Sequence, residues 1–199
     1  QCRRKATGGD KMNRGKMKKT ISVICLWAIG FILSWVAGNA YAASSGNVTV
    51  TVTIQNVSVS LSATGWDIGT IDAGQTVQMS ETSDITVTNN GNVSESFTLM
   101  LTNPTNWTAG SAAGSDVYVM KGLFVGASDA PASPDFGADD VITTNSQTAS
   151  ATILGAFSTT GNNVPALGSV DLWLQFTAPT STNVITEQSI VITVGATVP

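Results

Sequence analysis

Carboxylates and hydroxyls are nearly the only side chains in this sequence whose chemistry could act on a substrate. The chain has no His, and after residue 42 it has no Cys and no Arg, so that only Tyr118 and Lys121 add other reactive groups. The usual nucleophilic triads, zinc sites and guanidinium clamps are therefore excluded from that part of the chain. Two carboxylates could still serve as the acid and nucleophile of a glycosidase, but no spacing marks a pair. We therefore expect a protein that is not an enzyme and has no catalytic residue.

An acidic, turn-rich loop over residues 129–140 carries the candidate metal ligands, which are Asp129, Asp135, Asp139 and Asp140. Calcium takes oxygen ligands from carboxylates and carbonyls, so it is the one cofactor that this loop suggests, although the spacing matches no EF-hand. The alternative is a solvated surface loop that needs no cofactor. Within the loop, Ser133 followed by Pro134 predicts one short helical turn capped by Ser133.

Trp173 is a candidate contact for a glycan. Residues 170–176 alternate apolar and polar side chains, and if the apolar set faces the core, Trp173 points outward between Asp171 and Gln175. An exposed tryptophan beside hydrogen-bonding side chains can form a carbohydrate-binding face. The same pattern arises where a loop or a second subunit covers the strand. Both interpretations are open at this point.

Residues 47–61 carry a long β signal that changes parity in the middle. The first apolar set is Val48, Val50, Val52 and Ile54, and the second is Val57, Val59 and Leu61. Because a slip of one residue turns every side chain to the opposite face, Gln55 and Asn56 mark a bulge or a crossover. Either the two halves belong to the two sheets of one domain, or residues 48–54 are a donor strand that completes a second copy of the chain in an oligomer or filament.

The elements that would position these residues are strands. Alternation predicts strands over 84–88, 95–101, 170–177 and 188–194, a weak strand over 148–154, and a strand over 117–125 that is apolar on both faces. Asn90 and Gly91 lie between two of these and predict a hairpin turn. About eight or nine short strands with almost no helical periodicity predict an all-β, immunoglobulin-like antiparallel sandwich with Greek-key or jelly-roll connections.

A leader precedes this domain. Residues 17–42 combine a cationic start, an apolar run over 21–38 and a final Ala-x-Ala, which is typical of a secretory signal peptide. Residues 1–16 are then an upstream extension and residues 43–199 a single domain. A retained membrane anchor is the alternative, because 18 apolar residues could just span a bilayer.

Removal of the leader leaves one basic residue, Lys121, against twelve acidic residues, a formal net charge of −11. This charge argues against nucleic acid and anionic lipid as partners, so membrane contact is expected only through an uncleaved signal segment. We expect a protein that is secreted or displayed on the cell surface through the general secretory route.

Two segments carry a resemblance to known proteins: DIGTIDAG at 67–74 and ITVTNNGN at 85–92. Together they resemble the strand, glycine turn and V-x-N-x-G pattern of secreted bacterial immunoglobulin-like domains. The arrangement also resembles biofilm-fibre subunits of the TasA and camelysin type, in which an N-terminal strand inserts into the next subunit. This resemblance implies a structural filament role, and the alternative is a carbohydrate-binding or adhesive module that uses Trp173.

Overall fold

The computed structural model describes residues 46–126, 130–155 and 157–199, so the expected signal peptide lies outside the described residues. The chain divides into two compact units, Gln1–Val52 and Thr53–Pro199. Within the described part of the first unit, residues 46–52 form no strand. The described residues of the second unit form nine strands and one 3-10 turn, Ser133–Asp135. No helix among the described residues has the length and apolar character to cross a membrane.

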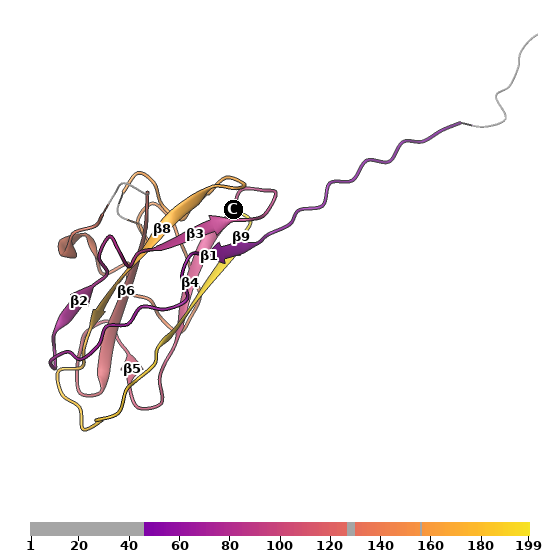
Figure 1. The fold of residues 1–199 in the computed structure, drawn as a ribbon. Helices are drawn as coiled ribbons and strands as arrows, with labels where there is room; N and C mark the ends of the chain where they lie inside the picture. Colours follow the sequence, from indigo (N-terminus) through magenta and orange to yellow (C-terminus); the bar gives the residue numbers. More distant parts are fainter. Residues whose placement is uncertain (1–45, 127–129, 156) are drawn as a thin grey trace, which may run out of the picture. The chain divides into compact units, whose positions relative to one another are not determined.

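The larger sheet is organised around strand β8, Ser169–Thr177 (Figure 1). One edge of β8 pairs with β6, Val117–Val125, and the other edge pairs with β3, Ile85–Asn89, and then with β2, Thr76–Gln78. These pairs are antiparallel, as is the pair of β3 with β1, Val59–Leu61. Strand β5, Thr108–Ala109, is parallel to the start of β6. The sheet is therefore mixed, and β8 holds its centre.

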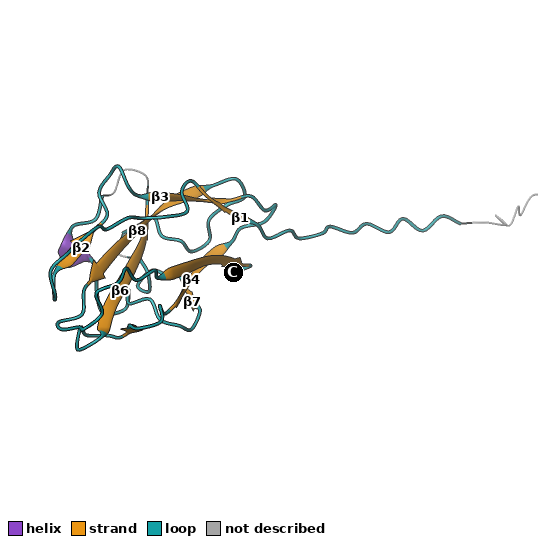
Figure 2. Cartoon of the chain, turned by 60° about the horizontal axis from the view of Figure 1, so that its bottom comes forward, coloured by secondary structure: helices purple, strands orange, loops and turns teal. Residues whose placement is uncertain are grey.

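The smaller sheet contains three antiparallel strands around β4, Ser96–Thr102. Strand β9, Val191–Thr197, pairs with β4 along its whole length, whereas β7, Gln147–Thr148, pairs with it at two residues. The ring of Phe97 on β4 packs on that of Phe124 on β6, with 5.7 Å between their centroids. Figure 2 shows β4 and β7 apart from β3 and β8. The two sheets therefore contribute to one hydrophobic core.

The predicted hairpin at Asn90 and Gly91 is wrong, although both of its strands form close to the expected bounds. Strand β3 pairs with β1 and β8, while β4 pairs with β7 and β9, so the connection passes from one sheet to the other. Gly91 does not take a positive φ, which occurs among the described glycines at Gly69 and Gly74. The Asn-Gly signal marks a turn, but the sheet to which each strand belongs depends on partners far away in sequence.

Of the two interpretations of Trp173, the one in which a loop covers the strand is confirmed and exposure to solvent is wrong, because its side chain is 5% exposed. Trp173 lies opposite Leu123 of β6, and alternation places both on the face turned away from Phe124 and the smaller sheet. Residues 131–136, which we call the cover segment, lie over this face. Three side chains of the larger sheet hold the cover segment by hydrogen bonds. Gln78 donates to the Pro131 carbonyl, Gln175 to Ser133, and Lys121 to the Phe136 carbonyl.

The remaining strand predictions are met in part. The strand predicted over 117–125, with apolar side chains on both of its faces, is confirmed as β6. In the predicted strand over 47–61, only β1 forms, and residues 48–54 belong to neither sheet. The strand predicted at 188–194 forms as β9, three residues later. Of the strand predicted at 148–154, only Thr148 belongs to a strand, the two-residue β7. Strand β2 was not predicted, although Val77 and Met79 alternate with polar residues, and neither was β5, which has only two residues.

Candidate functional site

The segment that precedes β1 exposes an apolar row. The side chains of Val48, Val50, Val52 and Ile54 are 88%, 83%, 83% and 76% exposed. The threonines between them are also exposed. β-branched residues favour extended chain and are rarely left in water as a row. Residues 48–54, which we call the assembly segment, therefore have the composition of a strand and no strand partner among the described residues.

Side-chain hydrogen bonds hold the end of this segment to the β3–β4 connection. The Asn92 amide nitrogen donates to the Ile54 carbonyl at 2.8 Å, and the Asn56 N–H donates to Asn92 Oδ1 at 2.7 Å. The Asn92 N–H donates to the Asn56 carbonyl, and the Asn90 N–H to that of Ser58. Residues 54–58 are thus fixed although they form no regular strand.

A buried acid reinforces this attachment. Glu95 is fully buried, and its Oε1 accepts the Ser58 N–H at 2.8 Å. Its Oε2 is buried and has no hydrogen-bond partner among the described residues. A Cβ on Gly91 would clash with Glu95 Oε1 and with the Asn56 carbonyl. The absence of a side chain at Gly91 is what lets this carboxylate reach the segment.

Strand β9 forms one edge of the smaller sheet, and part of it lies close to β1. Beyond its pairing with β4, no backbone hydrogen bond of β9 to another described segment is present. Ile192, Val194 and Ala196 pack against the core and stay partly exposed, and Val191 at one end is 56% exposed. A free edge of this kind can accept another strand. Strand β9 and the assembly segment each span seven residues.

Two of the candidate calcium ligands, Asp135 and Asp140, accept hydrogen bonds from N–H groups of their own loop. Asp129 lies outside the described residues. Asp135 Oδ2 accepts the Ala132 N–H, so the expected helical turn forms but Ser133 is not its cap. Asp140 Oδ2 accepts the Gly137 N–H at 2.7 Å. Among the residues that the structure describes, no three acidic, His or Cys side chains are grouped so as to hold a metal ion.

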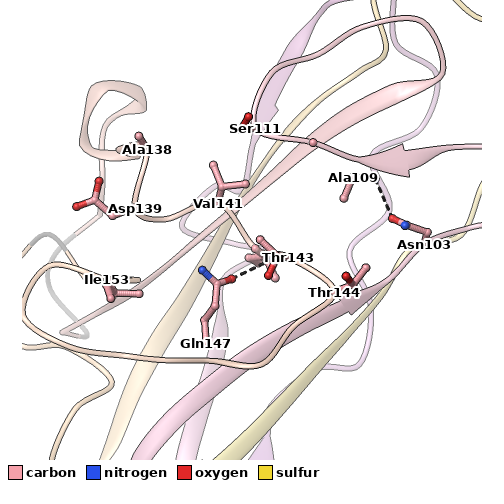
Figure 3. Close-up of a pocket in the computed structure, with 12 residues that line it drawn as sticks. Asn103, Ala109, Ser111, Ala138, Asp139, Val141, Thr143, Thr144, Gln147 and Ile153 are labelled. Carbon is pink, nitrogen blue, oxygen red and sulfur yellow. Dashed lines mark hydrogen bonds between the residues drawn. The ribbon is translucent and has the colours of Figure 1, made fainter.

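A pocket of about 610 Å³ opens where the edges of the two sheets approach each other (Figure 3). Residues 140–142 run beside β6, with the Gly122 N–H bonded to the Asp140 carbonyl and the Ile142 N–H to that of Met120. The chain then crosses to the smaller sheet, where the Leu101 N–H donates to the Thr143 carbonyl. The pocket lies along this crossing. Its lining is Asn103, Ala109, Gly110, Ser111, Ala138, Asp139, Val141, Ile142, Thr143, Thr144, Gln147 and Ile153.

Two amide side chains in this pocket are held by their oxygens. Asn103 Oδ1 accepts the Ala109 N–H at 2.8 Å and the Tyr118 hydroxyl at 3.0 Å. Gln147 Oε1 accepts the Thr143 N–H at 3.0 Å. The amide nitrogens of Asn103 and Gln147 have no hydrogen-bond partner among the described residues, so both orientations are fixed while both donors stay available.

Burial shifts two ionisable groups next to the pocket. It raises the pKa of Tyr118 to about 12, so the phenol that donates to Asn103 keeps its proton at neutral pH. Burial also raises the pKa of Asp140 above its ordinary 3.8, while the Gly137 N–H opposes the shift and the nearby Asp139 adds to it. Asp140 Oδ1 has no partner among the described residues, which fits a carboxyl group for which ionisation is unfavourable.

Sequence reasoning found the assembly segment and missed the pocket. The four predicted side chains of the segment are brought into one exposed row, whereas Trp173 is not part of any exposed surface. The pocket residues are spread from 103 to 153 and lie mostly in loops, where periodicity carries no information. The only available signal was the density of Asn, Gln, Ser and Thr in those loops.

Comparisons with known proteins leave the family open: the chain matches no protein-family profile, and no curated protein matches it.

Proposed function

We propose that this protein is an exported, non-enzymatic structural subunit of the cell surface or extracellular space, with an immunoglobulin-like sandwich fold. The assembly segment of one copy adds as a strand to the free edge of β9 in a second copy. The observation that carries this proposal is the row of four β-branched side chains, each at least three-quarters exposed, on a segment without a strand partner. The same mode of strand addition underlies many peptide and subunit contacts.

The apolar row alone offsets only the lower part of the free-energy cost of association. Burying four such side chains contributes about 6 kcal/mol at the lower end of the usual range for each. Backbone hydrogen bonds to a free edge and the partly exposed residues of β9 add to that term, because the incoming strand would cover them. Association itself costs about 4 to 15 kcal/mol. We therefore expect binding that depends on the whole row and that grows with protein concentration.

The test compares the two faces of the segment in the exported protein. Replacing Val48, Val50, Val52 and Ile54 together by Ser should abolish the oligomers or filaments that wild type forms, as seen by sedimentation velocity and negative-stain electron microscopy. The matched control replaces Thr49, Thr51 and Thr53 by Ser and should assemble as wild type does. Both sets of side chains are exposed, so neither change should affect folding. A folded chain that lacks residues 43–54 and associates unchanged would refute the proposal.

Cross-linking tests the acceptor edge. In a background with Cys2→Ser and Cys25→Ser, the variants Thr51→Cys and Thr193→Cys should be joined by a short bismaleimide when mixed. Thr159→Cys, at an exposed position outside β9, is the control partner and should give no product with Thr51→Cys. Equal yields with both partners would place the acceptor somewhere other than β9.

A further inference from the structure

We propose that the pocket between β5, β7 and residues 138–144 binds a neutral carbohydrate. This inference goes beyond assembly, because the pocket shares no residue with the assembly segment or with β9. At about 610 Å³ it is within the range of small-ligand sites, which lies at roughly 300 to 1,000 Å³. Val141 and Ile142 are buried and provide an apolar floor, and polar groups surround it.

The free polar groups match the hydroxyls of a sugar. The amide nitrogens of Asn103 and Gln147 are donors whose partner oxygens are already engaged. The hydroxyls of Ser111 and Thr144 have no hydrogen-bond partner among the described residues and can donate or accept. Asp139 also lines the pocket, but in Figure 3 its carboxylate points away from the other lining side chains. A ligand with several hydroxyl groups can satisfy donors and acceptors of this kind together.

Charge selects against other ligands. The lining contains no Lys or Arg, and Asp139 is its only charged residue, so phosphate, sulfate and carboxylate groups would meet no cation. The chain after residue 42 is strongly acidic as well, which lowers the local concentration of anions. A purely apolar ligand would leave the amide and hydroxyl groups without partners. A neutral sugar needs no cation in the lining, is not repelled by the acidic chain, and gives the amide and hydroxyl groups hydrogen-bond partners.

The amides are pre-organised because the fold, and not the ligand, orients them. Figure 3 shows the bonds from Ala109 to Asn103 and from Thr143 to Gln147, and both come from backbone groups. Binding therefore needs little additional ordering of these side chains. This feature separates the site from an exposed polar surface, where side chains have no fixed direction.

The experiment uses the exported wild-type protein on a glycan array that carries neutral, sialylated and sulfated glycans, followed by calorimetry with the best-bound soluble oligosaccharide. We expect neutral glycans to be bound and anionic ones not. Gln147→Glu keeps the acceptor for the Thr143 N–H and removes the donor, and Thr144→Val removes a hydroxyl without a change of shape. Each should weaken binding at least about tenfold. Ala138→Trp should abolish binding by filling the pocket.

Thr159→Val is the matched control and should bind as wild type does, because Thr159 is exposed and outside the pocket. Ala138 and Thr144 are also exposed, so we expect their variants to fold. An NMR titration of wild type needs no variant and should shift the amide signals of the pocket residues. The proposal is overturned if no neutral glycan binds, if anionic glycans bind equally well, if the pocket variants retain wild-type affinity, or if the shifted signals lie elsewhere.

Discussion

Gly91 occupies a point in the β3–β4 connection where a side chain has no room. Its missing Cβ leaves space for Glu95 Oε1 and for the Asn56 carbonyl, and through them the β3–β4 connection reaches the chain before β1. Glycine is therefore required here by a close approach and not by its freedom in φ. The buried carboxylate, its bond to Ser58 and this glycine form one unit.

A Gly91→Ala substitution should destabilise the protein by about 1 to 3 kcal/mol, because the new methyl group would displace the carboxylate or the segment. Gly65→Ala is the matched control. A Cβ at Gly65 meets no atom within 4 Å, so we expect no loss of stability there. Chemical denaturation measures both free energies of unfolding. Equal midpoints for the two variants would show that the crowding at Gly91 relaxes without cost.

At the scale of elements, the Asn92 side chain makes two of the hydrogen bonds that attach residues 54–58. Asn92→Ala removes the bonds to the Ile54 carbonyl and from the Asn56 N–H. We expect a loss of about 1 kcal/mol, because these bonds are exposed to water. Hydrogen exchange at the Asn56 amide should become faster while exchange in β4 stays unchanged. Asn90→Ala is the control: Asn90 is exposed, and only its backbone N–H takes part in the attachment.

Local patterns predicted elements far better than they predicted neighbours. Alternation placed β3, β4, β6 and β8 close to their observed bounds because a half-buried strand leaves that record in its own residues. No local pattern indicates that β3 pairs with β8, because this pairing joins residues more than 80 positions apart. A covered Trp173 was one of the two interpretations of the sequence, but the segment that covers it lies some 40 residues earlier and could not be identified from the alternation.

The candidate sites divide in the same way. The assembly segment could be singled out because seven consecutive residues carry its signal, an alternation of apolar β-branched residues with threonines. The pocket was not, since its amides are useful only once Ala109 and Thr143 hold them in place. In the acidic loop, two of the predicted calcium ligands, Asp135 and Asp140, bind N–H groups of their own loop, and the calcium site stays a prediction.

On the scale of the whole molecule, the burial of an acidic side chain makes the free energy of unfolding depend on pH. The folded state raises the pKa of Asp140, so it disfavours the ionised form. The stability associated with the protonated group is present below the ordinary value of 3.8 and is lost as the pH rises through the raised pKa. We therefore expect the free energy of unfolding to fall with rising pH in this window.

Asp140→Asn should flatten this dependence, because the amide does not ionise. Chemical denaturation at a series of pH values between about 4 and 8 measures the slope for each protein. Glu187→Gln removes a charge at an exposed position and should leave the slope close to that of wild type. A slope that is the same in wild type and Asp140→Asn would mean that this carboxyl group titrates alike in the folded and unfolded chains.

The central place of β8 has a consequence for synthesis and transport. The larger sheet is organised around a strand that begins at Ser169, and the smaller sheet needs β9, which begins at Val191. While the chain emerges from the ribosome, its first 168 residues lack the partners that both sheets require, and long-range pairing of this kind is slow. We therefore expect the nascent chain to stay unfolded until its last strands appear, which would suit the proposed export through a narrow secretion channel.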